Sequence, residues 1–225
     1  FEKEFFESKH NYPVKFLGHP LADSIYNFKT NYNSSNKFIT ADKKPIIAIL
    51  PGSRKQEIKK ILNTVIETVK YFKEYQFIVA GAPNIDLSYY TSIIKNKKIK
   101  VIENKTYELL SVSYAAIVTS GTATLETALF KVPQVVCYKS SYFSFIIAKL
   151  IVNIKYISLV NLIMDQEIVK ELIQHDCNKN KITKELKKIL DLNHRKSLKV
   201  KYDELTSILG NFGTSKRVAL DIITK

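Results

Sequence analysis

The sequence predicts a doubly wound α/β domain, in which helices cover both faces of a parallel sheet, followed by a helical C-terminal tail. Three observations predict this fold: short apolar runs, helix-like spacing of the apolar residues between them, and short connections. Uninterrupted apolar runs are typical of parallel strands, because these are buried on both faces. Strands that alternate with helices through short connections favour right-handed crossovers into one parallel sheet.

The predicted strands follow one another through the middle of the chain. We expect them at residues 46–50, 76–80, 99–102, 115–119 and 134–138. The first run stops at Pro51-Gly52 and the second at Gly81, and both residue types break regular structure. A further short apolar run, residues 14–17, ends at Gly18, and the polar residues 27–44 are predicted to form a loop or linker.

Between the strands, apolar residues recur three and four positions apart, which is the period of an amphipathic helix. In the longest such segment they are Ile58, Ile61, Leu62, Val65, Ile66, Val69 and Phe72. We expect helices at residues 55–72, 88–95, 107–113 and 121–130. From about residue 165 onward the chain is predicted to be helical, with stops near Asn178, Asn193 and Gly210.

The charge balance favours an anionic partner. The 225 residues include 35 Lys and Arg against 21 Asp and Glu, a formal net charge of +14. A basic surface suits a phosphorylated ligand, an anionic lipid or a nucleic acid, although a generally lysine-rich composition explains much of the excess equally well. No arginine-rich run or recognition helix supports nucleic acid, which we do not expect as a partner.

The two cysteines give no indication of a disulfide framework or a zinc site. Cys137 and Cys177 are far apart in sequence and have no histidines at the spacing of metal ligands. A disulfide framework and a zinc site are therefore not expected, and a reducing compartment is the default. We expect neither a bound metal nor a cofactor.

The first segment that indicates chemistry is Leu50-Pro51-Gly52-Ser53-Arg54, between a predicted strand and a predicted helix. Ser53 is a candidate N-cap, with Gln56 three residues on as in a capping box. The free N–H groups of a helix start attract anions. Arg54 adds a permanently charged fork that suits phosphate. An ordinary turn with a solvated arginine is the alternative. The segment is neither a Walker P-loop nor a dinucleotide fingerprint.

The second such segment is Ser120-Gly121-Thr122-Ala123-Thr124-Leu125-Glu126, again between a strand and a helix. Its hydroxyl groups can cap the helix or donate to phosphate. Gly121 permits close approach of the backbone to a ligand. Glu126 lies one helical turn beyond Thr122, so that a carboxylate could accept both hydroxyls of a ribose; a helix residue without a ligand is the alternative. Together the two segments suit a nucleoside diphosphate, bound where strand order switches at the carboxyl ends of the strands.

Four motifs, in order, resemble the lipid-A-disaccharide synthase family. Its LPGSR segment with a following glutamate matches residues 50–54 and Glu57. Its GHP(L/M)xD segment resembles residues 18–23, and its SGTAxLE segment resembles residues 120–126. Its YxSLPNLL and ExVxEL segments resemble residues 156–162 and 167–172. The resemblance covers nearly the whole chain, with Val160 in place of the family's proline.

The resemblance implies a GT-B glycosyltransferase built from two Rossmann-like halves. Residues 1–17 would close an N-terminal domain that this chain lacks, and residues 18–225 would form the UDP-sugar-binding domain, with C-terminal helices from about residue 165. The implied reaction is that of a hexosyltransferase. It transfers a diacylglucosamine unit from UDP to diacylglucosamine 1-phosphate, which forms the lipid A disaccharide.

The resemblance also implies roles for named residues. Arg54 would be catalytic, because it neutralises the diphosphate as UDP leaves. His19 would have a positioning role at the junction between the two halves. The residues implied to contact the UDP-sugar are Gly52, Ser53, Glu57, Ser120, Gly121, Thr122, Glu126, Asn161 and Glu167. The general base is expected in the half that this chain lacks, so this chain alone should be inactive.

Two alternatives remain open from the sequence. One is another GT-B enzyme that uses a UDP-sugar, such as a UDP-N-acetylglucosamine epimerase or a peptidoglycan glycosyltransferase. The other is an inactive nucleotide-binding module. The sequence leaves the oligomeric state open, a homodimer included.

Residues 142–164 raise the question of a membrane. They are rich in Phe, Ile and Leu, but Lys149, Asn153 and Lys155 interrupt them. The run is therefore shorter than the roughly 20 apolar residues that a membrane span needs. An amphipathic interfacial helix and a core or interdomain helix both fit the pattern. Because the implied substrates are acylated, we expect a cytoplasmic protein that rests on the anionic inner face of the bacterial inner membrane.

Overall fold

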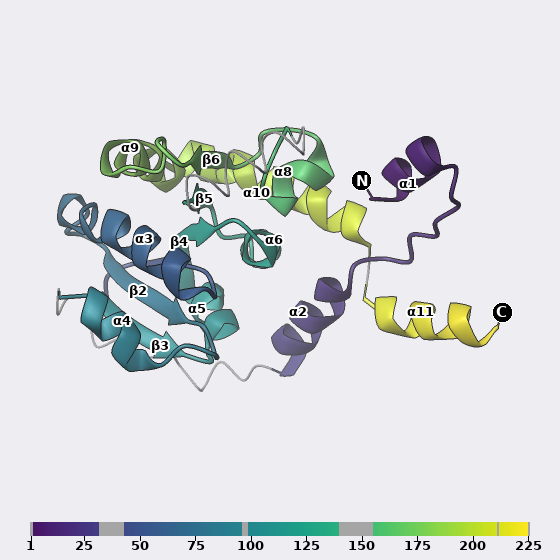
Figure 1. The fold of residues 1–225 in the computed structure, drawn as a ribbon, viewed down its shortest axis with the longest axis horizontal. Coiled ribbons are helices and arrows are strands. Elements are labelled where there is room, and N and C mark those ends of the chain that lie inside the picture. Colours follow the sequence, from purple (N-terminus) through teal and green to yellow (C-terminus); the bar gives the residue numbers. More distant parts are fainter. Residues whose placement is uncertain (1, 32–42, 96–98, 140–154, 211, 225) are drawn as a thin grey trace.

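The computed structural model describes residues 2–31, 43–95, 99–139, 155–210 and 212–224. Six parallel strands form one sheet in the order β3-β2-β1-β4-β5-β6 (Figure 1). The strands are β1 Ile46–Leu50, β2 Gln76–Gly81, β3 Ile99–Glu103, β4 Ser113–Thr119, β5 Gln134–Tyr138 and β6 Lys170–Ile173. The order runs outward from β1 in one direction and from β4 in the other, so strand order switches between these two strands. The predicted doubly wound parallel sheet is confirmed.

Helices cover both faces of the sheet. They are α3 Lys55–Ile66, α4 Leu87–Ile93, α5 Thr106–Val112, α6 Thr122–Leu129, α8 Leu159–Met164, α9 Lys179–Leu190 and α10 Leu192–Leu209. Alternate residues of β1 point to opposite faces. Ile47 and Ile49 pack in one core cluster with residues of α3, α4 and α9. Ala48 and Leu50 pack in another cluster with residues of α5.

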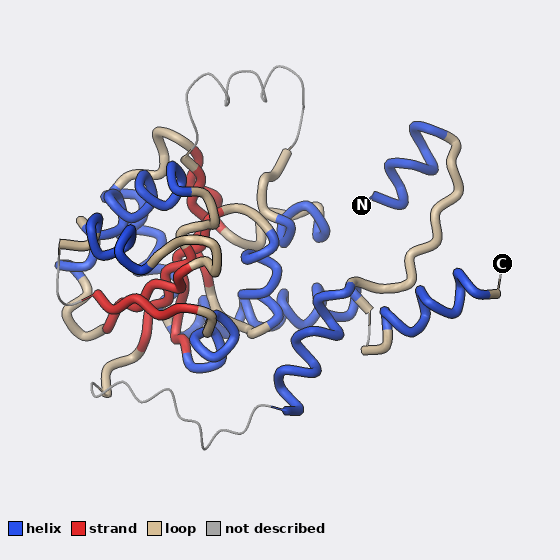
Figure 2. Tube along the Cα trace, turned by 60° about the horizontal axis from the view of Figure 1, so that its bottom comes forward, coloured by secondary structure: helices blue, strands red, loops and turns tan. Residues whose placement is uncertain are grey.

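Three helices extend from this body. They are α1 Glu2–His10, α2 Pro20–Asn31 and α11 Thr214–Ile223. α11 packs against α2, and both α1 and α11 lie on the side away from the strands (Figure 2). Asp23 of α2 holds the start of α11, because its carboxylate accepts hydrogen bonds from the backbone N–H groups of Gly213, Thr214 and Ser215.

Several predicted boundaries were wrong. The chain beyond residue 165 is not uniformly helical, because residues 170–173 form the edge strand β6. Residues 27–31, predicted as loop, continue α2. The predicted helix 55–72 ends at Ile66 and is followed by a short 3-10 helix, Val69–Tyr71. The side chain of Thr68 donates to the carbonyl of Val65 at 2.7 Å, a local bond that competes with continued α-helix.

Of the three helix ends predicted in the C-terminal tail, two were wrong. Asn178 begins α9 rather than ending a helix, and Asn193 lies in the first turn of α10. Gly210, with φ 85°, does end α10 as expected. Within the described parts of the chain, none of the helices combines the length and apolar character needed to cross a bilayer. Of the predicted membrane-contacting segment, residues 142–154 lie outside the described residues.

Candidate functional site

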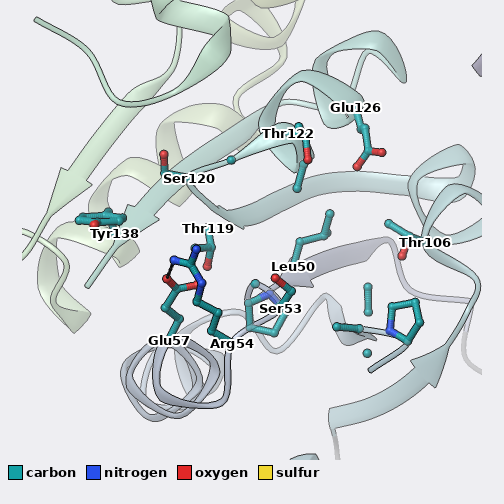
Figure 3. Close-up of a pocket in the computed structure, with 18 residues that line it drawn as sticks. Leu50, Ser53, Arg54, Glu57, Thr106, Thr119, Ser120, Thr122, Glu126 and Tyr138 are labelled. Carbon is teal, nitrogen blue, oxygen red and sulfur yellow. Dashed lines mark hydrogen bonds and ion pairs between the residues drawn. The ribbon is translucent and has the colours of Figure 1, made fainter. Parts of the chain in front are cut away.

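A pocket of about 520 Å³ lies where strand order switches, at the carboxyl ends of β1 and β4 (Figure 3). We call it the switch-point pocket. Its lining comprises residues 50–54, 80–83 and 119–123 together with Glu57, Thr106, Glu126 and Tyr138. The two segments singled out in the sequence therefore line the same pocket, and its volume is within the usual range for small-molecule sites.

The first wall of the pocket is the turn from β1 into α3. Gly52 has φ 100°, a conformation that favours glycine. A Cβ at this position would lie 3.2 Å from Glu57 Oε2 and 3.5 Å from Thr119 Cγ2. The turn is thus packed between its own helix and the end of β4, and glycine makes this close approach of the two junctions feasible.

Arg54 and Glu57 form an ion pair at the start of α3. Arg54 Nη1 donates to Glu57 Oε1 at 3.1 Å, and the arginine side chain is 81% exposed while the glutamate side chain is 20% exposed. A carboxylate beside a diphosphate would repel it, so the physical role that fits Glu57 is to orient Arg54. The predicted cap was wrong: Arg54 occupies the N-cap position, without a side-chain cap bond, and Ser53 precedes it.

The second wall is the turn from β4 into α6. Gly121 is the N-cap residue, with φ 148° and ψ −167°, and a Cβ there would meet nothing within 4 Å. The first backbone N–H groups of an α-helix have no partner within the helix, and α6 begins at Thr122. Its positive end therefore faces the pocket beside an open approach over Gly121. The Thr124 hydroxyl donates back to the Gly121 carbonyl at 2.8 Å.

Ser120 lines the pocket, but its polar groups have partners within the chain. Its hydroxyl donates to the carbonyl of Ile157 at 2.7 Å, and its backbone N–H donates to the carbonyl of Cys137 at 3.3 Å. The hydroxyl proton expected to reach phosphate is thus directed at the segment that precedes α8. Ser120 joins that segment to the pocket wall.

Thr119 is a pocket residue whose hydroxyl the sequence places near the start of the second helix, but it was not among the predicted ligand contacts. It is the last residue of β4, is 5% exposed and lines the pocket. Among the described residues, its hydroxyl Oγ1 is buried without a hydrogen-bond partner. A buried polar group of this kind calls for an explanation, and a contact between this hydroxyl and a bound ligand is a hypothesis that substitution of Thr119 can test. The sequence shows a threonine at the end of an apolar strand, but only the structure shows that its hydroxyl is buried.

Glu126 reaches the pocket from the second turn of α6 and is partly buried. Its Oε1 accepts a hydrogen bond of 2.9 Å from the phenol of Tyr107, which belongs to α5. Burial, followed by the charge and hydrogen bond of Glu126, raises the pKa of the Tyr107 phenol, so that the phenol remains protonated and donates. Figure 3 shows Thr122 and Glu126 along the same helix, across the pocket from Arg54 and Glu57.

The structure does not bring Asn161 and Glu167 into the pocket lining. Asn161 is fully buried, and its amide donates to Val169 O and Glu171 Oε1 and accepts from the N–H groups of Ile168 and Val169. All of its ordinary hydrogen-bonding positions are used within the chain. Its observed contacts are therefore structural.

Glu167 forms an exposed ion pair with Lys170 at 2.8 Å. Glu171 instead organises the segment, because its carboxylate accepts from the backbone N–H groups of Ile157 and Ser158, each at 2.9 Å. This network ties α8 to the edge strand β6.

His19 lies in a different place from the other candidates. Its Nδ1 accepts from the backbone N–H of Leu21 at 3.2 Å, and the backbone N–H of His19 donates to the carbonyl of Leu209 at 2.9 Å. It lines a second pocket, of about 770 Å³, between the N-terminal segment and α10. Its contacts link α2 to the end of α10, near the point where α11 departs. Within the described residues, no group of three or more potential metal ligands is clustered.

The chain is similar to known proteins over nearly its whole length. The family model described as "Lipid-A-disaccharide synthetase" matches residues 1–220. A lipid-A-disaccharide synthase from Coxiella burnetii (strain Dugway 5J108-111) is 34% identical over 224 residues, which are 97% of this chain and 59% of the relative. One from Anaeromyxobacter dehalogenans (strain 2CP-C) is 32% identical over 99% of this chain and 60% of the relative. The chain thus spans about three fifths of the length of these relatives.

Solved structures share the fold at low sequence identity. A UDP complex of MnaA from S. aureus aligns with TM-score 0.63 and 17% identity, over 97% of this chain and 58% of that one. A UDP-GlcNAc 2-epimerase from Neisseria meningitidis bound to UDP-GlcNAc aligns with TM-score 0.56 and 14% identity, over 93% and 54%. The calicheamicin glycosyltransferase CalG4 aligns with TM-score 0.59 and 10% identity, over 99% and 55%. These likenesses support the GT-B half-fold.

Proposed function

Because the chain belongs to the lipid-A-disaccharide synthetase family, we propose that it is the donor-binding half of a glycosyltransferase that uses UDP-diacylglucosamine. The reaction transfers the diacylglucosamine unit to diacylglucosamine 1-phosphate and releases UDP. The observation that carries this proposal is the switch-point pocket, because two helix starts, Arg54 and Glu126 surround one space. That set of groups matches a diphosphate joined to a ribose.

Negative charge develops on the diphosphate as UDP departs, and the groups of the switch-point pocket would stabilise that charge. Arg54 and the N-terminal ends of α3 and α6 supply positive charge where the diphosphate would lie, and such preorganised charge stabilises a leaving anion. Glu126 supplies an acceptor for ribose hydroxyls, and Thr119 a buried hydroxyl. In this proposal the general base and the acceptor site lie in the remaining part of the enzyme, since this chain spans about three fifths of the length of its relatives.

We further propose that the N-terminal segment 1–17 and α11 contact that remaining part. Both α1 and α11 lie beside the body rather than over the sheet (Figure 1). They expose large apolar side chains, which on a soluble surface mark an interaction site when they gather. The exposed residues are Phe5, Phe6, Tyr12, Phe16, Val218, Leu220, Ile222 and Ile223.

Titration calorimetry tests the donor site. We expect UDP to bind this chain, and UMP to bind at least about 10-fold more weakly, because loss of one phosphate removes charge-assisted hydrogen bonds. Absence of UDP binding, or equal affinity for UMP, would contradict the proposal. Incubation with both acylated substrates should give no disaccharide, since this chain spans only about three fifths of the length of its relatives, and no epimerisation of UDP-N-acetylglucosamine should occur.

We also propose a peripheral contact with the anionic inner face of the bacterial inner membrane. The acylated substrates and the net charge of +14 support it, because each basic residue near an anionic surface adds about 1 kcal/mol. In flotation, the chain should rise with phosphatidylglycerol vesicles at low salt and dissociate at high salt. Equal recovery with neutral vesicles would contradict this part of the proposal.

A further inference from the structure

The carboxylate of Glu126 is held at a fixed place in the switch-point pocket, and the group that holds it lies outside the pocket. Glu126 lines the pocket, whereas Tyr107 does not. The Tyr107 phenol nevertheless donates to Glu126 Oε1 at 2.9 Å from the neighbouring helix α5. A hydrogen bond from a phenol to a carboxylate is charge-assisted and therefore stronger than one between neutral groups.

Tyr107 is itself held in position by aromatic packing. Its ring meets the ring of Phe28 edge-on, with centroids 5.5 Å apart, and the ring of Phe130 with centroids 5.3 Å apart. The rings of Phe28 and Phe130 also meet edge-on, at 5.7 Å. Because the three aromatic residues come from α5, α2 and the end of α6, the position of the phenol is determined by three elements at once. Lys29 lies over the Phe130 ring at 5.3 Å and donates to the carbonyl of Leu129.

The hydrogen bond leaves the carboxylate with capacity for a ligand. An ionised carboxylate has two oxygens and about four acceptor positions, of which the phenol uses one. A glutamate side chain in solution samples many rotamers, and ordering it costs entropy. When one oxygen is already tethered, less of that ordering remains to be done on ligand binding. The raised pKa of the phenol keeps its proton in place through the physiological range.

We propose that Tyr107 is a positioning residue for the ribose of the nucleotide, acting through Glu126. The phenol orients the carboxylate so that its remaining acceptor positions meet the ribose 2′- and 3′-hydroxyls. Tyr107 thereby contributes to the selection of a ribonucleotide without touching it. This inference rests on the proposed function, because it takes the pocket to be a UDP site.

Tyr107→Phe tests the inference, since it removes the hydroxyl and keeps the ring that packs on Phe28 and Phe130. Calorimetry should be run with UDP and with 2′,3′-dideoxy-UDP, which lacks both ribose hydroxyls. We expect the substitution to weaken UDP binding about 3- to 10-fold and to leave binding of the dideoxy compound unchanged. Tyr26→Phe is the matched control, because Tyr26 stacks on Phe212 on the exposed side of α2 and should have no effect on either ligand.

A double-mutant cycle separates positioning from packing. In the Glu126→Ala background, Tyr107→Phe should have no further effect on UDP affinity. Unchanged UDP affinity in Tyr107→Phe, or an equal loss with both ligands, would overturn the inference while the proposed function stands. If the unaltered chain binds no UDP, the proposed function itself fails, and the inference fails with it.

Discussion

Arg54 Nη1 lies 3.1 Å from Glu57 Oε1, one helical turn away at the start of α3. The ion pair orders the Arg54 side chain, which is 81% exposed, in the lining of the switch-point pocket. An exposed ion pair contributes roughly 0–1 kcal/mol to folding. The ion pair therefore contributes little to folding stability, and its main effect is to position the Arg54 guanidinium.

The first prediction follows from that placement. Arg54→Ala should weaken UDP binding by about 10-fold, since a charge-assisted hydrogen bond is lost, while the free energy of unfolding changes by less than about 1 kcal/mol. Arg54→Lys should be intermediate, because an ammonium keeps the charge but not the fork. Calorimetry and urea unfolding measure the two effects.

The same substitution leaves Glu57 as an unpaired negative charge beside the diphosphate. Adding Glu57→Gln to Arg54→Ala should therefore recover part of the lost affinity. Full UDP affinity in Arg54→Ala would refute the assignment of this residue.

A second prediction concerns the buried hydroxyl of Thr119. Thr119→Val keeps the shape of the side chain and removes an oxygen that lacks a hydrogen-bond partner among the described residues. We expect stability to be unchanged or increased, because an unsatisfied buried polar group is removed. UDP affinity should fall about 3- to 10-fold. Thermal unfolding with and without UDP measures both; an unaltered UDP-induced shift of Tm would count against a ligand contact.

A third prediction contrasts the two pocket glycines. Gly52→Ala and Gly121→Ala should each cost about 1–3 kcal/mol of stability, because both glycines have positive φ angles that strain other residues. At Gly52 the new methyl would also press on Glu57 Oε2, 3.2 Å away, whereas at Gly121 it would meet nothing within 4 Å. Gly52→Ala should therefore be the more destabilising of the two in urea unfolding. The reverse order would contradict the packing described for the first turn.

A fourth prediction concerns acid stability. Hydrogen bonds from the backbone and side chain of Ser215, together with those from Gly213 and Thr214, lower the pKa of Asp23 from 3.8 to about 2. A depressed carboxylate pKa stabilises the fold above the unfolded-state value, and this contribution is lost as the pH falls from about 4 to about 2. Urea unfolding from pH 5 downward should show a shallower pH dependence in Asp23→Asn than in the unaltered chain.

Asp86→Asn is the control for that experiment, because Asp86 is an exposed N-cap residue without a side-chain cap hydrogen bond. It should keep the steep pH dependence of the unaltered chain. If Asp23→Asn and Asp86→Asn behave alike, then Asp23 does not anchor α11 in the manner described.

The sequence predicts the centre of the sheet well because its signal there is local. The strands β1 and β5 begin and end at the predicted residues, since β1 is a continuous apolar run and β5 is apolar after Gln134, and turn-forming or polar residues flank both. For the same reason both strand-to-helix turns were placed correctly. Their convergence on one pocket follows from the parallel arrangement of the strands.

The missed features depend on contacts between distant residues. The strand β6 begins with two charged residues, Lys170 and Glu171, so its sequence lacks the apolar run that predicted the other strands. Its strand conformation is evident only from its pairing with β5. Asn161 matches a family motif, but the partners of its four side-chain hydrogen bonds lie seven to ten positions away in the sequence. Tyr107 lies 19 residues from Glu126, so only the fold reveals that they meet.

The most direct test of the account is a structure of this chain with UDP, solved after soaking or co-crystallisation. We expect the diphosphate oxygens within hydrogen-bonding distance of the backbone N–H groups that open α6 and of the Arg54 guanidinium, with the ribose hydroxyls at Glu126. UDP bound elsewhere, or bound with its diphosphate pointing away from both turns, would contradict the claim that the two turns form a diphosphate site.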